Sequence, residues 1–448
     1  MSNSGDKPVV SANEIKLEET MSIRFKLAGA VSGVAILASA VAAQADVLFW
    51  STQAKPVEEA QAMREQVLAG AGDVDYQPND GGPWLTRLQA ELQAGSGSIG
   101  VLGALHGDFS AMNPDDLVDL DGLGMSASDT FNSLAKLGTD NMQYIPWMQA
   151  SYIMAANKEA LQYLPDGANI DALTYDQLIA WAANVNAAVG EPKFGFPAGP
   201  QGLKHRFFQG YLYPSFTDGV VRTFASDDAV AAWEKFRELW AQTNPASTNF
   251  SFLQEQLLNG DAWIVFDHTS RLAQAFNERP DDFVAFPAPA GPTGRGFMPV
   301  LAGVAIPRTA PDMDAAKALV QHMLKPETQI ATLRATQIAT LRATNFFPVV
   351  DVELPGDLPP AVKAAGDAVA KMSGSADANP GLLPAGLGDK GGEFSALYTE
   401  AFERIVLAGQ DIRMVLDDIK PRLQAVMDAS GAPCWAPDAA SDGPCPVE

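Results

Sequence analysis

The chain has 448 residues, 47% of them apolar and 19% charged, with 54 acidic side chains against 30 basic ones. This composition excludes a disordered chain and a polytopic membrane protein, and the length allows two or three domains. The formal charge of −24 repels phosphate backbones and anionic lipids. No run of lysine or arginine offsets it, so the sequence excludes nucleic acid as a partner.

The first 45 residues have the pattern of an export signal. Arg24 and Lys26 precede an uncharged stretch that ends in Ala43-Gln44-Ala45, the small-x-small pattern of a signal peptidase site. The alternative is a membrane anchor, which needs about twenty strongly apolar residues, whereas this stretch is rich in Ala, Gly and Ser. Translation starts at Met1 or at Met21. We therefore expect cleavage after Ala45 and a periplasmic protein of a Gram-negative bacterium.

The first elements of the mature chain alternate between strand and helix. Apolar runs predict strands at 47–50, 73–77 and 99–105, and helical spacing predicts helices at 55–68 and 83–94. This alternation indicates parallel strands with helices on the faces of the sheet, so ligands are expected outside the carboxyl ends of the strands.

The later elements are predicted from apolar runs, caps and glycines. Thr174 and Gln177 form a capping box, which starts a helix that ends near Gly190. Core-facing aromatic residues at helical spacing are Trp181, Trp233, Phe236 and Trp240. Further expected elements are the apolar segment 145–156, strands at 262–266 and 300–306, and helices at 253–258, 394–407 and 412–427. The Pro/Gly-rich passage 283–299 is expected to cross between lobes.

Two local features stand apart from this pattern. Cys434 and Cys445 lie in a Pro-rich tail with ten residues between them, which predicts a disulfide clip rather than a zinc site. The octapeptide TQIATLRA occupies 328–335 and is repeated at 336–343. A lengthened helix that buries one face, or a duplication artefact in the coding sequence, are the two interpretations.

Catalytic motifs are missing from the sequence. The G-x-G-x-x-G match at 95–100 follows a helix and precedes a strand, which is the reverse of a pyrophosphate-binding turn. The four histidines are far apart along the chain, and the acidic pairs are typical of solvated turns. The sequence therefore predicts a binding protein without metal or cofactor rather than an enzyme.

Several segments, taken together in order, resemble the family 1 extracellular solute-binding proteins of bacterial ABC sugar importers, the maltose-binding-protein type. They are FWST at 49–52, LTRLQAELQAGSGSIGVLGAL at 85–105, IPWMQASYIMAANKEALQYLP at 145–165, GDAWIVFDHTSRL at 260–272, FPAPAGPTGRGFMPVLAGVAIPRTAPD at 286–312, and KPETQ followed by NFFPVV. The chain departs from the family at Gly100, where an Asp is common, and at the repeated octapeptide.

The resemblance implies two α/β lobes, each a mainly parallel sheet flanked by helices, joined by three crossovers near 147–151, 298–303 and 349–352. The first lobe would comprise 46–148 and 302–349. The second would comprise 149–301 and 350–448. The sugar would lie in the cleft between them.

A sugar site needs flat aromatic platforms with hydrogen-bonding side chains around them. Residues at strand ends, helix starts or crossovers that offer this chemistry are Trp50, Gln53, Trp84, His106, Asp108, Trp147, His205, Arg206, Trp263, Asp267, His268, Arg271 and Phe394. Trp263 is the foremost candidate, because relatives place an aromatic contact in its segment. Core packing is the alternative for Trp50, Trp84 and Phe394.

The resemblance implies a monomer that captures a monosaccharide, oligosaccharide or polyol and delivers it to the transmembrane subunits of an ABC permease. Polyamine, ferric ion or an anionic sugar held by Arg206 or Arg271 are alternative ligands. An exported glycosidase or lyase is the alternative from another class.

Overall fold

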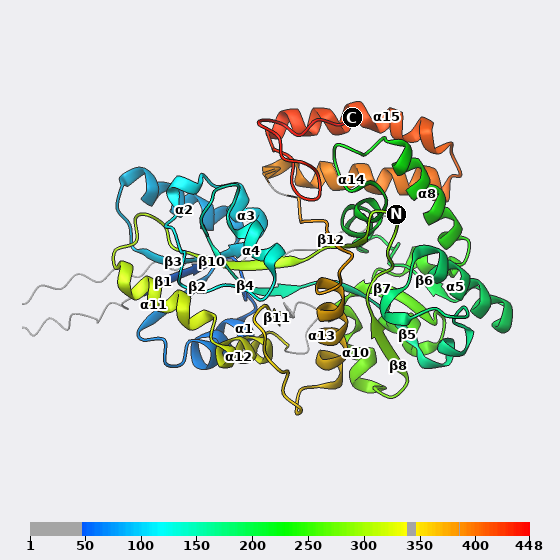
Figure 1. The fold of residues 1–448 in the computed structure, drawn as a ribbon, viewed down its shortest axis with the longest axis horizontal. Helices are drawn as coiled ribbons and strands as arrows, with labels where there is room; N and C mark the ends of the chain where they lie inside the picture. The colour runs from blue at the N-terminus through cyan, green and yellow to red at the C-terminus, as the bar shows by residue number, and fades with distance from the viewer. Residues whose placement is uncertain (1–46, 338–345, 385) are drawn as a thin grey trace, which may run out of the picture. The chain divides into compact units, whose positions relative to one another are not determined.

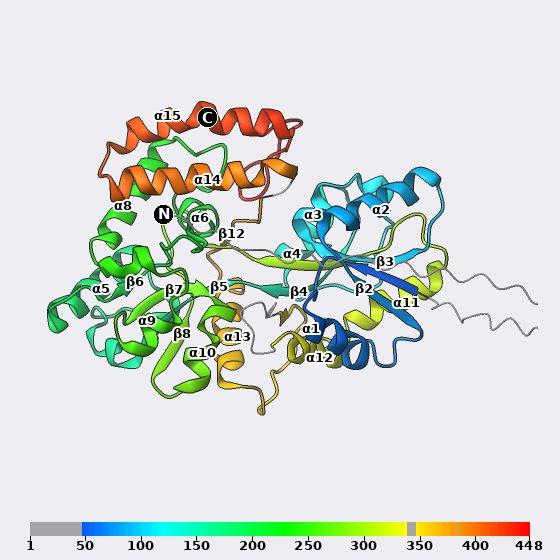
Figure 2. The ribbon, with the colours of Figure 1, turned by 180° about the vertical axis from the view of Figure 1, so that it is seen from behind.

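The computed structural model describes residues 47–337, 346–384 and 386–448. The predicted export signal and residues 338–343 of the second octapeptide lie outside the described residues. Within the described residues, no helix is both long and apolar enough to cross a membrane. Figures 1 and 2 show two groups of strands, each with its own helices, and we refer to them as the first and the second lobe.

The first lobe is built on a six-stranded sheet in the order β11-β4-β10-β3-β1-β2. As predicted, β1, β2 and β3 are parallel. β10 pairs antiparallel with β3 and β4, because β4 leads the chain out of this lobe and β10 leads it back. The strands are β1 (Val47–Ser51), β2 (Val74–Pro78), β3 (Ile99–Leu105), β4 (Ile145–Ala150), β10 (Val300–Ala305) and β11 (Phe347–Pro348).

Among the described residues, six α-helices accompany this sheet, and two of them begin beside the carboxyl ends of the parallel strands. These two are α2 (Gly81–Ala94) and α3 (His106–Ser110), which follow β2 and β3. The others are α1 (Val57–Ala62), α4 (Asp129–Ala135), α11 (Met313–Met323) and α12 (Pro326–Thr336). Loops at these strand ends are therefore available to a ligand, as expected for parallel sheets.

The second lobe contains a four-stranded sheet in the order β6-β7-β5-β8 and a two-stranded sheet of β9 and β12. β5 pairs antiparallel with β7 and β8, and β6 is parallel to β7. The strands are β5 (Tyr152–Asn157), β6 (Phe194–Gly195), β7 (Ile264–His268), β8 (Phe283–Phe286), β9 (Arg295–Phe297) and β12 (Ala378–Pro380).

The helices of the second lobe include a long C-terminal pair, α14 (Gly391–Phe402) and α15 (Ile412–Ser430), which lie side by side in Figures 1 and 2. The capping box of α5 is confirmed, since Thr174 Oγ1 accepts from Gln177 N and Gly190 ends the helix at a φ of 88°. The remaining helices are α5 (Tyr175–Val189), α6 (Lys204–Phe207), α7 (Tyr213–Thr217), α8 (Asp227–Trp240), α9 (Gln254–Asn259), α10 (Thr269–Glu278) and α13 (Pro360–Ser373).

In the part of the chain that the structure describes, three connections join the lobes. Ser151 separates β4 from β5, and its hydroxyl donates to Met298 O at 3.1 Å in the second connection, between β9 and β10. The third runs from β11 to α13. Because the first two connections are bonded to each other, the chain segments between the sheets form a common base.

The first octapeptide copy lies in α12. Leu333 is fully buried and Ile330 is partly buried against the core. Gln329 Oε1 accepts from Val349 N at 2.9 Å, which ties the helix to the end of β11. Thr336, the first residue of the second copy, accepts from Phe346 N at 3.1 Å. The repeat therefore supplies helix contacts through its first copy.

The C-terminal tail is closed by the predicted disulfide between Cys434 and Cys445. The carboxylate of Asp438, inside this loop, is 7% exposed and accepts from the backbone N–H groups of Val220, Val221 and Arg222. The disulfide thus closes a loop within the tail, and the carboxylate of Asp438 attaches this loop to the second lobe.

Replacing both cysteines with serine is expected to lower the free energy of unfolding by about 3 kcal/mol, because the open tail gains chain entropy in the unfolded state. Urea unfolding of the oxidised protein and of the Cys434→Ser/Cys445→Ser variant measures the difference. Treating the wild type with a reductant serves as a control and is expected to give the same loss. Equal midpoints for all three samples would show that the clip adds no stability.

Candidate functional site

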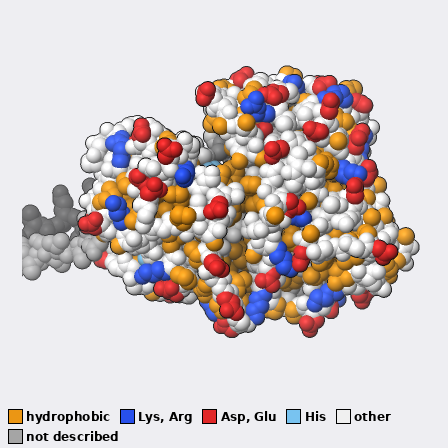
Figure 3. All heavy atoms as spheres, viewed as in Figure 1, with side chains coloured by type: hydrophobic (Ala, Val, Ile, Leu, Met, Phe, Trp, Pro, Cys, Tyr) orange, Lys and Arg blue, Asp and Glu red, His pale blue; other side chains and the backbone are white. Residues whose placement is uncertain are grey.

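A cavity of about 790 Å³ lies between the two lobes, at the carboxyl ends of the parallel strands of the first. Figure 3 shows the surface hollowed between the part that carries α2 and α3 and the part that carries α14. The first-lobe wall consists of Gly81, Gly82, Trp84, Leu85, Gln89, Leu105, Gly107, Asp108, Ala111 and Met112. The second-lobe wall consists of Arg206, Leu383, Pro384, Gly386, Leu387, Gly388, Gly391 and Ser395.

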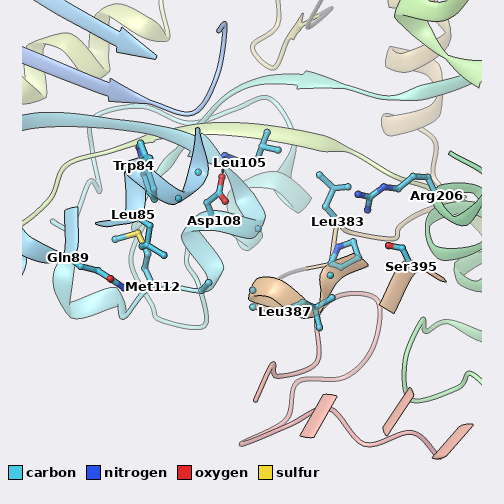
Figure 4. A pocket seen from close by; sticks show the side chains of 18 residues that line it. Trp84, Leu85, Gln89, Leu105, Asp108, Met112, Arg206, Leu383, Leu387 and Ser395 are labelled. Carbon is cyan, nitrogen blue, oxygen red and sulfur yellow. Dashed lines mark hydrogen bonds between the residues drawn. The ribbon is translucent and has the colours of Figure 1, made fainter. Parts of the chain in front are cut away.

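The wall combines apolar surface with a few polar groups. Figure 4 shows Leu85 and Met112 on one side and Leu387 on the other. The side chains of Gln89 and Ser395 also line the cavity, and neither is bonded to another side chain or to backbone in the described residues. Such a wall offers apolar contact together with free hydrogen-bonding groups, which is the chemistry of a small-molecule site.

Trp84 lines the cavity, but its ring is held inside the first lobe. Its Nε1 donates to Trp50 O at 3.1 Å, and Trp50 Nε1 donates to Trp84 O at 3.1 Å. Trp84 is 2% exposed and Trp50 6%. The guanidinium of Arg87 lies 4.5 Å from the ring centroid of Trp50. The alternative of core packing therefore describes both tryptophans, and the prediction that they are open platforms is corrected.

Asp108 reaches the cavity from the start of α3. Its Oδ2 accepts from Leu105 N at 3.1 Å and from Thr52 Oγ1 at 3.5 Å, and burial raises its pKa above the ordinary value. Gln53 Nε2 donates to Thr52 Oγ1 at 2.8 Å, so Gln53 joins this cluster without lining the cavity. The loops after β1 and β3 are thereby fixed to each other beside the cavity.

His106 lies behind Asp108 rather than in the cavity wall. Its Nδ1 is 2.8 Å from Tyr144 Oη, and the side chain is buried. Burial lowers the pKa of His106 to about 4, so the ring is neutral at neutral pH. Its role in the described structure is to pack and to hold the first turn of α3.

Arg206 enters the cavity wall from α6 in the second lobe (Figure 4). Its Nη1 is buried and has no hydrogen-bond partner in the described residues. Burial lowers its pKa from the ordinary value. The neighbouring His205 does not line the cavity, and burial followed by the charges of Arg206 and Lys204 lowers the pKa of His205 to about 4.

Trp263, the foremost predicted contact, is placed at the wrong end of its strand. It precedes β7, and its carbonyl accepts from Asn157 N at the far end of β5. Tyr152 pairs with His268 at the other end of these strands, where the chain enters the second lobe. The prediction is wrong because the antiparallel pairing of β5 and β7 directs the start of β7 away from the connection between the lobes.

Asp267, His268 and Arg271 form a structural cluster outside the cavity wall. Asp267 is fully buried and accepts from Leu253 N at 2.9 Å and from Arg271 Nη1 at 3.4 Å. Burial raises the pKa of Asp267 to about 6 and lowers that of His268 to about 3. His268 Nδ1 lies 2.8 Å from Ser270 Oγ at the start of α10. These residues join β7, α10 and the segment before α9.

Two further predicted residues belong to the core. Trp147 and Phe394 are both fully buried and do not line the cavity. Trp147 packs between Phe49 and Phe346, and Phe394 packs against Trp435 in the C-terminal tail. Their selection from the sequence is corrected, since an aromatic residue at a crossover or helix start is equally suited to packing.

The segment between β12 and α14 supplies most of the second-lobe wall, and none of its residues is among those predicted from the sequence. It is rich in glycine and proline, and that density is the signal that marks it as a loop. The tail supports this segment, since Leu382 N donates to Ala436 O at 3.1 Å. Its place beside the first lobe depends on packing across the chain, for which the sequence carries no local sign.

The described residues contain no group of three or more His, Cys, Asp or Glu side chains that could hold a metal ion. The chemistry of the cavity is therefore that of hydrogen bonds, one carboxylate, one guanidinium and apolar contact.

Solved structures similar to this chain are receptors with two lobes. The solute receptor AcbH, described as exclusive for β-D-galactopyranose, is 16% identical and has a TM-score of 0.66, with 85% of this chain and 97% of that chain covered. The sugar-binding protein MalE of Xanthomonas citri is 16% identical, with a TM-score of 0.65 and coverage of 85% and 96%. The acarbose receptor GacH of Streptomyces glaucescens is 17% identical, with a TM-score of 0.54 and coverage of 84% and 97%.

These identities establish the shared fold alone. Among curated protein sequences no match is found. The family model of the bacterial extracellular solute-binding proteins matches residues 54–330, which is more than half of the chain. The chain belongs to this family, and its two-lobed fold is of the maltose-binding type.

Proposed function

We propose that this protein is the periplasmic substrate-binding component of an ABC importer and that it captures a sugar, in the form of a monosaccharide, an oligosaccharide or a polyol. The observation that carries the proposal is a cavity whose wall is divided between two lobes, in a member of a solute-binding family. Two similar receptors are described with galactopyranose and acarbose as ligands. The volume of about 790 Å³ lies in the range of small-molecule sites.

The wall suits a sugar in two respects. Leu85, Met112 and Leu387 offer apolar surface to the C–H faces of a ring. Gln89 and Ser395 offer hydrogen bonds to hydroxyl groups, one from each lobe. A ligand that bonds to both lobes favours the arrangement in which both contacts are made.

Transport follows from this coupling. Ligand that first touches one lobe gains the contacts of the other only when the lobes come together, so binding energy shifts the population toward a closed form. A micromolar ligand supplies about 8 kcal/mol in total, and only the part specific to the closed form produces the shift. A membrane permease then recognises the closed form, and the sugar passes on chemically unchanged.

Tryptophan placed at Gly81 or at Gly391 is expected to abolish sugar binding, because each glycine belongs to the cavity wall of one lobe. A Cβ at either position meets no atom within 4 Å, so the folded state tolerates the new side chain. A thermal-shift screen of the mature protein against sugars and polyols identifies the ligand, since a ligand at 100 times its dissociation constant adds about 2.7 kcal/mol. Both variants are expected to lose this shift.

Gly356→Trp provides the matched control. Its Cβ also meets nothing within 4 Å, and Gly356 lies outside the cavity wall. The control is expected to keep the full ligand-induced shift. Retention of the shift in both cavity variants, or turnover of the sugar during incubation, would contradict the proposal.

A further inference from the structure

Arg206 differs from every other arginine that the structure describes. Each of the others has a hydrogen-bond or ion-pair partner. Arg206 has neither, although it lines the cavity and its Nη1 is buried. Arg206 is half-buried as a residue, but a buried cationic nitrogen without a partner costs free energy, so its Nη1 is arranged for a group that comes from outside the chain.

The surroundings of Arg206 supply no anion. Its neighbours in α6 are Lys204 and His205, and the phenol of Tyr152 is the group that interacts with it electrostatically. Burial holds the pKa of Tyr152 at about 12, so this phenol is neutral. No carboxylate of the described residues forms an ion pair with Arg206. The guanidinium therefore presents an uncompensated positive charge to the cavity.

Arg271, in the same lobe, has the hydrogen-bond and ion-pair partners that Arg206 lacks. Its Nη1 donates to Ser251 O at 3.2 Å and to the buried carboxylate of Asp267 at 3.4 Å. Its guanidinium also lies 4.4 Å from the ring centroid of Phe252. Of the two arginines predicted from the sequence as anion contacts, Arg206 alone is both free and in the cavity wall.

Asp108 is the one acidic side chain in the described cavity wall, and it belongs to the other lobe. Its carboxylate already accepts from Leu105 N and Thr52 Oγ1. A ligand that fills the cavity separates these two charges, so Arg206 requires a partner on the ligand itself.

We propose that the cognate sugar carries a carboxylate, as a uronic acid or an oligosaccharide that contains one, and that Arg206 binds this carboxylate. A guanidinium pairs with a carboxylate through two parallel charge-assisted N–H···O bonds, which are stronger than its bonds to neutral hydroxyl groups. The rest of the sugar contacts the apolar side chains of the wall, the amide of Gln89 and the hydroxyl of Ser395. This inference rests on the proposed sugar-binding function and names the class of sugar.

Calorimetric titration with matched sugar pairs tests the inference. The probes are D-galacturonate with D-galactose, D-glucuronate with D-glucose, and digalacturonate with galactobiose, at one fixed ionic strength. In the wild type the acidic member of the cognate pair is expected to bind at least about tenfold more tightly. Arg206→Gln is expected to weaken binding of the acidic sugar by about 30-fold or more, since removing one partner of a buried charge pair costs at least that much affinity. The affinity for the neutral sugar of the pair is expected to change far less.

Control variants separate the guanidinium from general effects of charge. Lys158→Gln removes the same charge from an exposed side chain at the far end of β5, and it is expected to leave both affinities unchanged. Arg206→Lys keeps the charge without the paired donors and is expected to restore part of the preference. Neutral-sugar binding by Arg206→Gln reports that the variant is folded.

The results that overturn the inference are distinct from those that overturn the proposed function. The carboxylate proposal is rejected if neutral sugars bind as tightly as acidic ones or more tightly, and if Arg206→Gln leaves the ratio of the two affinities unchanged. The proposed sugar-binding function would still stand. If Asp108→Asn changes the affinities for the acidic and the neutral sugar in the same way as Arg206→Gln does, the partner of Arg206 is Asp108 and not a carboxylate of the ligand. Acetate or inorganic phosphate binding as tightly as the uronates would reject the sugar as the source of the anion. Binding of no sugar at all would reject the proposed function.

Discussion

Replacing Trp147 with alanine is expected to lower the free energy of unfolding by about 3–5 kcal/mol. Trp147 lies in β4, is fully buried, and has ring centroids 6.3 Å from Phe49 and 5.8 Å from Phe346. Alanine would leave a cavity between the first sheet and the segment after α12, because close-packed neighbours relax only in part. Urea unfolding followed by circular dichroism measures the loss.

Trp147→Phe is the matched variant. The indole Nε1 of Trp147 has no hydrogen-bond partner in the described residues, so phenylalanine sacrifices packing volume and no hydrogen bond. Less than half of the alanine effect is therefore expected. Sugar affinity of the folded protein is expected to stay the same in both variants, since Trp147 does not line the cavity. If either variant kept the wild-type stability but lost sugar affinity, Trp147 would instead be a ligand-binding residue.

The elements that the sequence predicts well are those with local signals. The capping box of Thr174 and Gln177 starts α5, and glycines in the left-handed region end α5 and α15 at Gly190 and Gly431. Apolar runs separated by helical spacing give the parallel strands β1, β2 and β3. Each signal involves residues that are close together in the sequence, so a short segment is enough to predict the element.

The cavity wall was predicted less completely because it depends on contacts between distant segments. Asp108 and Arg206 line the cavity, whereas Trp263 lies at the remote end of β7. Its position follows from the direction in which β7 pairs with β5, and a single strand carries no sign of that direction. The wall residues Leu387 and Gly388 follow a loop that is bonded to the C-terminal tail through Leu382 N and Ala436 O, which is also a long-range effect.

The hydrogen-bonding state of a side chain is a further property that the sequence leaves open. Arg206 and Arg271 are indistinguishable in sequence as candidates for an anion, and both lie in the first turn of a helix. The fold gives Arg271 a buried carboxylate and leaves Arg206 without a partner. The distinction that matters for the ligand arises only when β7, α6 and α10 are brought together.

The free energy of unfolding is expected to fall steeply as the pH is lowered from 6.5 to 4, because three histidines are held neutral by burial. Their pKa values are lowered to about 4 for His106 and His205 and to about 3 for His268. The unfolded chain protonates these rings below pH 6.5 and the folded chain does not, so the unfolded state binds more protons in this range. Each histidine contributes a loss of up to about 1.4 kcal/mol per pH unit.

Three buried acids oppose this trend, because burial raises the pKa values of Asp108, Asp267 and Asp438. Asp267 has a pKa raised to about 6, so between pH 6 and 4 the folded state binds a proton that the unfolded state does not, and stability rises as the pH falls. The three histidine shifts are expected to outweigh those of the aspartates and to leave a net loss on acidification. Urea unfolding at pH 7.5, 6.5, 5.5 and 4.5 measures the slope, and His106→Gln is expected to reduce it by up to about 1.4 kcal/mol per pH unit. Stability that stays level or increases toward pH 4.5 would show that these rings are protonated in the folded protein.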